Sequence, residues 1–124
     1  MIVESSIHDQ VVTEIVRRAK LIRVGGPNDP ATETGPLISA NHLGKVNEYV
    51  TKAVDEGAKL LVGGAPLTEG DYVKGHYFAP TVLDNCNTKM SCVQDESFGP
   101  IITVETFKTE AEAIAIANDT IYGL

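Results

Sequence analysis

The chain has 124 residues and a formal net charge of −7, with 17 acidic against 10 basic side chains. This length predicts one domain with its own core, because a chain of this size buries roughly two-thirds of its unfolded surface without metal or disulfides. The acidic balance argues against a nucleic-acid-binding protein, since the largest basic cluster is the short stretch from Arg17 to Lys20.

The sequence also argues against membrane and secreted classes. It holds no stretch that is long and apolar enough to span a bilayer. The first residues, Met1 to Glu4, lack the charged and apolar regions of a signal peptide. Cys86 and Cys92 have five residues between them, which is not a zinc-ligand spacing. We therefore expect two reduced thiols in a cytosolic protein, with no membrane and no nucleic acid as partner.

The chain begins with a predicted strand and helix. Residues 1–3 are apolar and have the pattern of a strand end. Ser6, with Asp9 three residues later, is typical of a capped helix start. Apolar residues then recur at helical spacing as far as Ile22.

A second helix follows an ordered loop. Residues 25–36 are rich in proline and glycine and predict turns. Ser39 is the expected N-cap of the helix and Gly57 its expected C′ residue. The predicted apolar face consists of Leu43, Val46, Val50, Ala53 and Val54.

Two strand-like segments come next. Residues 59–62 predict a short strand, and residues 67–75 a polar surface loop. Residues 77–83 are strand-like, but Pro80 restricts this segment to a sheet edge or an irregular stretch.

The last part of the chain predicts a strand and a helix. Residues 101–107 have the best strand composition. Thr109 and Glu112 form a capping box for a third helix, which ends near Asn118. Two helices, three strands and a final helix together predict an α/β fold, with helices packed on a twisted, mostly parallel sheet.

The stretch from Gln94 to Pro100 places an acid and an aromatic residue two positions apart. From an extended segment, Glu96 and Phe98 point the same way. A carboxylate beside an aromatic face suits a ligand with hydroxyls and a flat ring, such as a ribose joined to a nicotinamide. By itself, however, the local pattern fits better with a plain strand entrance that carries a solvated acid and a core phenylalanine.

Other candidates for chemistry are weaker. Cys92 lies close to Asp95 and Glu96, which would raise the pKa of its thiol and disfavour a nucleophile. The three histidines are far apart and predict surface or capping roles, and neither double glycine matches a phosphate-binding loop. The residues at issue are His8, His42 and His76, then Gly25-Gly26 and Gly63-Gly64.

Several blocks of residues, in their order and spacing, resemble the aldehyde dehydrogenase superfamily. They extend over nearly all of the chain, and the ordered set is far more specific than any single block. The block sequences are most similar to the betaine-aldehyde and amino-aldehyde branch. The blocks are TGPLI at 34–38, HLGKV at 42–46, EGAK at 56–59 with GG at 63–64, GHYFAPTV at 75–82, ESFGP at 96–100 and ANDTIYGL at 117–124.

The resemblance implies a cofactor site. In this family the acid of the E-x-F-G-P motif hydrogen-bonds the nicotinamide ribose and the aromatic residue packs beside the nicotinamide. Glu96 and Phe98 are thereby implied as cofactor-binding residues for NAD or NADP. Ser97 replaces a larger apolar residue, and its side chain is expected to face away from the cofactor. His42 and Lys45 match a helix position that approaches the cofactor in some members, with a solvated helix face as the alternative.

The resemblance also implies a reaction. In the family, a cysteine thiolate attacks an aldehyde, hydride passes to the nicotinamide, and water hydrolyses the resulting thioester to a carboxylic acid. An oxyanion hole stabilises the tetrahedral species. The substrate is a small aldehyde, and the parent protein is implied to be a homo-oligomer. The nucleophile belongs to a block that would precede Met1, so no residue of this chain is a predicted catalytic residue or metal ligand.

We therefore expect residues 1–124 to be a partial catalytic domain, truncated at both ends. By itself it is expected to be inactive and to bind no cofactor. The alternative is a free-standing binding or assembly module that performs no chemistry. The coding sequence before Met1 distinguishes the two, because the first hypothesis requires a Gly-Gln-x-Cys block there.

Overall fold

The structure is a computed structural model that describes residues 1–122. None of the helices among these residues is long and apolar enough to cross a membrane. In chain order, the elements are β1 (Ile2–Glu4), α1 (His8–Ala19), α2 (Ala40–Asp55), β2 (Lys59–Val62), β3 (Pro66–Leu67), the 3₁₀ helix η1 (Gly70–Lys74), β4 (Tyr77–Phe78), β5 (Thr81–Asp84), α3 (Ser91–Gln94), β6 (Ile101–Thr103), β7 (Glu105–Phe107) and α4 (Glu110–Ala117).

The strands combine parallel and antiparallel pairs. In the sheet of order β2-β5-β6, β5 pairs with β2 in antiparallel fashion and with β6 in parallel. β1 runs parallel to β7, and β3 pairs antiparallel with β4. The predicted α/β fold class is confirmed, with parallel pairing where β1 meets β7 and where β5 meets β6.

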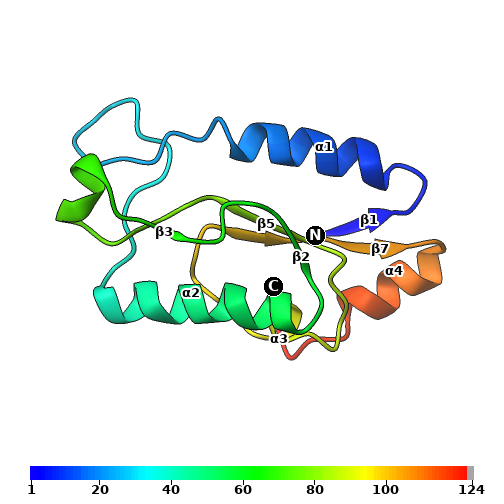
Figure 1. The fold of residues 1–124 in the computed structure, drawn as a ribbon. Coiled ribbons are helices and arrows are strands. Elements are labelled where there is room, and N and C mark those ends of the chain that lie inside the picture. The colour runs from blue at the N-terminus through cyan, green and yellow to red at the C-terminus, as the bar shows by residue number, and fades with distance from the viewer. Residues whose placement is uncertain (123–124) are drawn as a thin grey trace.

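Helices cover both faces of the β2-β5-β6 sheet. α1 lies on one face and α2 on the other (Figure 1). Two consecutive, fully buried residues of β5, Val82 and Leu83, pack on opposite sides of the sheet, because neighbouring side chains of a strand point to opposite faces. Val82 packs in the α1 layer with Val3, Ala19 and Val104. Leu83 packs in the α2 layer with Val46, Val50, Ala53, Ala58, Phe78, Cys86, Met90 and Cys92.

Two predicted strands are divided. Residues 77–83 break at Pro80, so that β4 joins β3 while β5 joins β2 and β6. The irregular stretch expected at Pro80 is present, but an edge position is wrong for β5, which is the central strand of its sheet. Residues 101–107 break at Val104, which is fully buried and donates its N–H to Leu83 O over 2.8 Å. The strand therefore passes from one sheet to the other at this residue.

Helix starts follow the capping chemistry in two cases out of three. The side chain of Ser39 accepts from the N–H of His42, and Thr109 with Glu112 forms the predicted capping box. The predicted Ser6 cap is wrong, because α1 has Ile7 as its N-cap residue with no side-chain cap hydrogen bond. The hydroxyl and the N–H of Ser6 bind the carboxylate of Glu4 instead. The Ser6 hydroxyl is therefore engaged by Glu4 and does not cap the helix.

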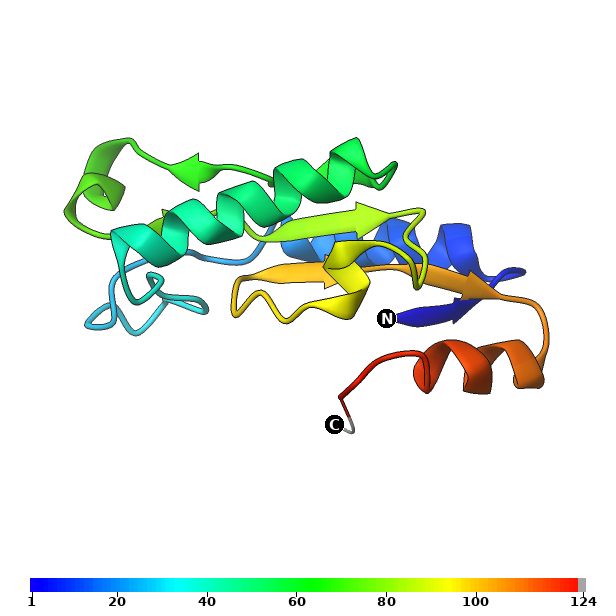
Figure 2. The same ribbon diagram turned by 90° about the horizontal axis from the view of Figure 1, so that it is seen from below.

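The helix ends can be compared with the predictions as well. α1 ends at Ala19, three residues before Ile22. Gly57 follows α2 with a left-handed φ of 108°, as predicted for a C′ residue. Its N–H donates to Val54 O over 3.0 Å. α4 lies beside β1 and β7 at the margin of the molecule (Figure 2) and contains no buried residue.

Candidate functional site

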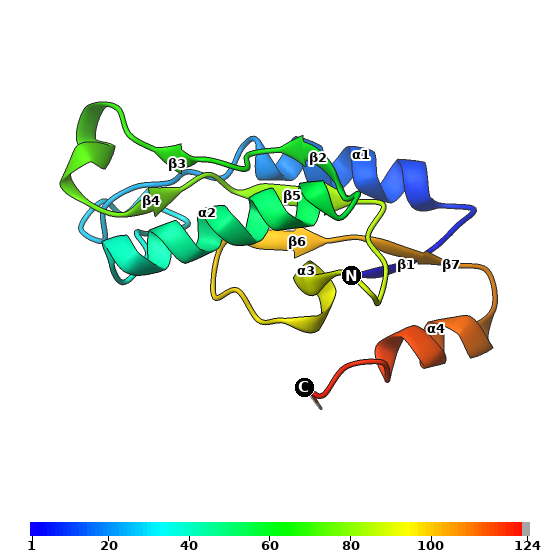
Figure 3. The same ribbon diagram turned by 60° about the horizontal axis from the view of Figure 1, so that its bottom comes forward.

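The motif at residues 96–100 lies in the loop that connects α3 with β6 (Figure 3). Glu96 is exposed, and Phe98 exposes 74% of its surface. Phe98 also has a left-handed φ of 49°, which is uncommon for a residue other than glycine. The strand-like alternation predicted for this segment therefore stops within the motif, and a core phenylalanine at a strand entrance is wrong. The acid and the aromatic ring both face solvent.

Two side chains of α2 hold the backbone of this loop. His42 Nε2 lies 3.0 Å from the carbonyl oxygen of Phe98 and donates a hydrogen bond to it. The Tyr49 hydroxyl lies 2.7 Å from the carbonyl oxygen of Cys92 and 2.9 Å from that of Asp95. His42 and Tyr49 are two helical turns apart and so share one face of α2. The loop is therefore fastened to this face both before and within the motif.

Gly99 brings the loop into close contact with the same helix. A Cβ atom at this position would lie 2.9 Å from Cγ1 of Val46. Val46 is buried, and its position in α2 lies between those of His42 and Tyr49. A larger residue would thus push the loop away from α2. The hydroxyl of Ser97 accepts a hydrogen bond from the N–H of Gly99 over 3.2 Å, which further shapes the turn. That Ser97 faces away from a cofactor stays a prediction.

The side chains of the site divide into one that holds the loop and two that can bind a ligand. Partial burial raises the pKa of Tyr49 to about 12, so its hydroxyl remains a protonated donor to the loop carbonyls at neutral pH. Glu96 presents carboxylate oxygens that act only as acceptors when ionised. The exposed ring of Phe98 offers an apolar face two residues away. This combination can bind a sugar hydroxyl and pack against a flat ring.

The two cysteines do not belong to this site. Both are buried in the α2 layer, with 7% of Cys86 and 3% of Cys92 exposed. The hydrogen bond that Cys92 donates to Cys86, together with burial, raises the pKa of the Cys92 thiol. The predicted direction of this shift is correct, but the nearby sulfur rather than Asp95 or Glu96 is its main cause. Because the thiolate is the reactive form, Cys92 is a poor nucleophile toward an aldehyde while the Cys86 thiol is its partner.

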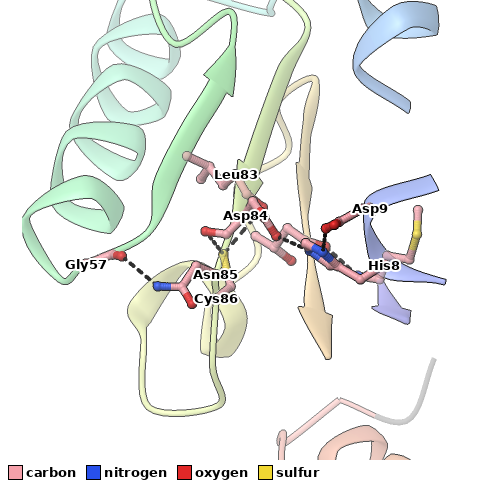
Figure 4. A network of polar contacts seen from close by, with 9 residues as sticks. His8, Asp9, Gly57, Leu83, Asp84, Asn85 and Cys86 are labelled. Carbon is pink, nitrogen blue, oxygen red and sulfur yellow. Dashed lines mark hydrogen bonds and ion pairs between the residues drawn. The ribbon is translucent and has the colours of Figure 1, made fainter. Parts of the chain in front are cut away.

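Two of the histidines, His8 and His42, bind residues that are distant in the sequence. The His8 side chain is 22% exposed and makes polar contacts beyond the predicted surface or capping role, since Nε2 lies 2.8 Å from Asp84 Oδ1 and Nδ1 lies 2.9 Å from Asp9 Oδ1 (Figure 4). His42 holds the motif loop, as described above, while Lys45 is exposed. Within residues 1–122, no group of three His, Cys, Asp or Glu side chains is placed to hold a metal ion.

Tyr49 is the residue of the site that the sequence analysis missed. A signal was available, because His42, Val46 and Tyr49 recur at the spacing of one helix face. The apolar pattern of α2 predicts a core face, whereas a half-buried tyrosine on that face also carries a polar tip that can anchor a distant loop.

Comparisons with known proteins agree with this geometry. The sequence profile of the Aldehyde dehydrogenase family matches residues 1–124. The chain belongs to the aldehyde dehydrogenase family. It is 50% identical to betaine aldehyde dehydrogenase of Bacillus subtilis (strain 168) over 124 residues, which are 100% of this chain and 25% of that protein.

Solved structures give the same result for the fold. A betaine aldehyde dehydrogenase of Staphylococcus aureus in complex with NAD+ superposes with a TM-score of 0.96 at 46% identity, over 99% of this chain and 24% of that one. A mutant of the same enzyme, solved without cofactor, gives a TM-score of 0.95 over 99% of this chain and 25% of that one. The predicted resemblance to the betaine-aldehyde branch is confirmed, and the chain spans about a quarter of the length of these relatives.

Proposed function

We propose that the protein containing these residues is an NAD-dependent aldehyde dehydrogenase that oxidises betaine aldehyde or a similar small aldehyde to the acid. The support for the aldehyde is the 50% identity to a betaine aldehyde dehydrogenase over all of the chain. The support for NAD is that a relative of the same fold was solved in complex with NAD+. The observation that carries the proposal is the exposed pair of Glu96 and Phe98 on a loop that α2 fastens.

In this proposal the two motif residues bind the cofactor. Glu96 accepts a hydrogen bond from a hydroxyl of the nicotinamide ribose, and Phe98 packs beside the nicotinamide ring. His42 and Tyr49 act as positioning residues, because they bind the loop carbonyls. When bound, NAD supplies the hydride acceptor for the oxidation. The contribution of this segment is to hold the cofactor in place.

The thiolate for the attack on the aldehyde is assigned to another part of the protein. Cys86 and Cys92 are both buried and packed in the α2 layer. We accordingly expect the 124-residue chain to produce no NADH from aldehyde and NAD. Sustained turnover by this chain would contradict the assignment.

A chimera tests the proposal directly. Residues 1–124 replace the matching quarter of the Bacillus subtilis betaine aldehyde dehydrogenase, and NADH formation is followed with betaine aldehyde. We expect an active enzyme in which Glu96→Gln raises the KM for NAD or lowers kcat. Phe98→Ala should act in the same direction, with a loss on the order of 1 kcal/mol from the aromatic contact beyond area burial.

The control is Glu69→Gln, which changes an exposed acid in a different loop and should leave the kinetics as they are. Unchanged kinetics with NAD in the Glu96→Gln chimera would refute the ribose role. A folded chimera with no activity at all would favour the alternative of a non-catalytic module.

A further inference from the structure

Cys86 and Cys92 form a pair of free thiols whose sulfur atoms lie 4.0 Å apart. Cys86 follows β5, while Cys92 belongs to α3, the single helical turn that leads into the Glu96 loop. A disulfide requires the sulfurs to come within about 2.05 Å of each other. The sulfurs must therefore approach by roughly 2 Å, and no other residue needs to be displaced from between them because each thiol already contacts the other.

We propose that this pair is a modification site for a small peroxide, which converts it to an intramolecular disulfide. Cys86 is the more exposed of the two thiols, at 7% against 3% for Cys92. It lines an open cavity of about 300 Å³ together with Ser5, His8, Asp84 and Thr106. A molecule of the size of hydrogen peroxide fits this space, so Cys86 is the sulfur that reacts with the peroxide first and Cys92 is the resolving thiol.

The chemistry balances with hydrogen peroxide as the oxidant. The sulfur of Cys86 attacks one peroxide oxygen, the O–O bond breaks, and the departing hydroxide takes the thiol proton to form water. Cys86 is then a sulfenic acid, which condenses with a thiol. The sulfur of Cys92 attacks the sulfenic sulfur, the S–O bond breaks, and the hydroxide takes the Cys92 proton as a second water. The two thiols lose two electrons and the peroxide gains them.

The disulfide reaches the motif through α3. Cys86 is fixed to the sheet by its N–H, which donates to Val104 O over 3.0 Å. α3 is only four residues long and is held from α2 by the Tyr49 hydroxyl at Cys92 O. Closing the disulfide draws Cys92 toward Cys86, so α3 shifts relative to α2 and the contacts of Tyr49 stretch. Oxidation thereby loosens the loop that begins at Asp95.

The disulfide is tested on the 124-residue chain with hydrogen peroxide, followed by trypsin without reductant. Lys89 lies between the two cysteines, so the peptides 75–89 and 90–108 separate unless a disulfide links them. We expect a linked pair lighter by two hydrogens in a monomeric chain, which dithiothreitol separates again. Cys92→Ser should instead accumulate a sulfenic acid at Cys86 that dimedone traps. The Cys86→Ser chain, treated alike, should leave Cys92 as a thiol.

Three results would overturn the proposal. The thiols could stay reduced at peroxide concentrations that oxidise free cysteine, the link could form only between two chains, or the urea-unfolded chain could form the link as fast as the folded one. The effect on the loop is measured separately by amide hydrogen exchange at Val93 to Asp95. Faster exchange in the oxidised chain is expected, and unchanged exchange would refute the coupling between the disulfide and the loop. Neither readout involves aldehyde turnover, so these results are independent of the dehydrogenase proposal.

Discussion

The two long helices cover opposite faces of the same sheet but are attached to the molecule in different ways. α2 buries Val46, Val50 and Ala53 and has a side-chain cap at Ser39. α1 buries only Ala19 and has no side-chain cap. Its first residue, His8, instead forms an ion pair with Asp84 at the end of β5. α2 is thus held by apolar burial and capping, whereas α1 depends to a larger extent on a titratable contact at one end.

The two helices also differ in their contacts with the candidate site. The polar residues of α2 that flank its buried stripe reach the Glu96 loop, so the packing of α2 and the shape of the candidate site are coupled. α1 makes no such contact with that loop among the described residues. Changes in the α2 layer should therefore affect both stability and the loop, and changes in α1 should affect stability alone.

The largest expected effect is a cavity in the α2 layer. Leu83→Ala removes a fully buried side chain and should lower the free energy of unfolding by about 2–5 kcal/mol. The matched control is Leu60→Ala, where the leucine is 41% exposed and the loss should be much smaller. Urea denaturation measures both. Equal losses would show that the α2 layer is not the more tightly packed environment.

The next effect concerns the anchor of the loop. Tyr49→Phe removes the hydroxyl that binds the carbonyls of Cys92 and Asp95, and should cost about 1–3 kcal/mol together with faster amide exchange in the loop. Tyr72→Phe is the control, because the Tyr72 hydroxyl binds Val24 O at a distance from the motif. It should leave exchange at residues 95–99 unchanged, and a similar increase there would contradict a specific role for Tyr49.

A smaller effect compares the two helix starts. Ser39→Ala should lower the free energy of unfolding by about 1 kcal/mol, because it removes the acceptor of the His42 N–H. Ser6→Ala should have no capping effect, since the Ser6 hydroxyl binds Glu4 rather than the helix. Denaturation of both variants under one condition checks this. A greater loss for Ser6→Ala would restore Ser6 as the cap of α1.

The smallest effect is a pH dependence confined to α1. Hydrogen bonds to Asp84 and, secondarily, Asp9 raise the pKa of His8 above 6.5. The folded state therefore favours the protonated ring, so the added stability is full below pH 6.5 and disappears as the pH rises through the raised value. The difference in unfolding free energy between the native chain and His8→Gln should shrink over this interval.

Two carboxylate variants sharpen the same measurement. Asp84→Asn should remove more of the pH dependence than Asp9→Asn, because the Asp84 side chain is 12% exposed and that of Asp9 is 100% exposed. A pH-independent difference between the native chain and His8→Gln would refute the ion pair as a source of stability.

The sequence predicted the features that depend on neighbours along the chain. The capping residues Ser39 and Thr109, the C′ glycine at Gly57 and the α/β class all follow from local backbone chemistry and hydrophobic periodicity. The ordered blocks were also sufficient to predict the family, because they are a property of the sequence itself. Where a local rule failed, at Ser6, a second polar side chain competed for the same group.

Only the tertiary structure decided how distant residues meet. The seven-residue step from His42 to Tyr49 indicates a shared helix face but not that this face binds the loop at 95–98. The left-handed backbone of Phe98 and the close contact of Gly99 with Val46 depend on where α2 lies against that loop. The approach of Cys86 to Cys92 has the same origin, since the path of the chain between β5 and α3 sets it. Contacts of this kind arise from the packing of elements in space, which hydrophobic spacing and local propensity do not specify.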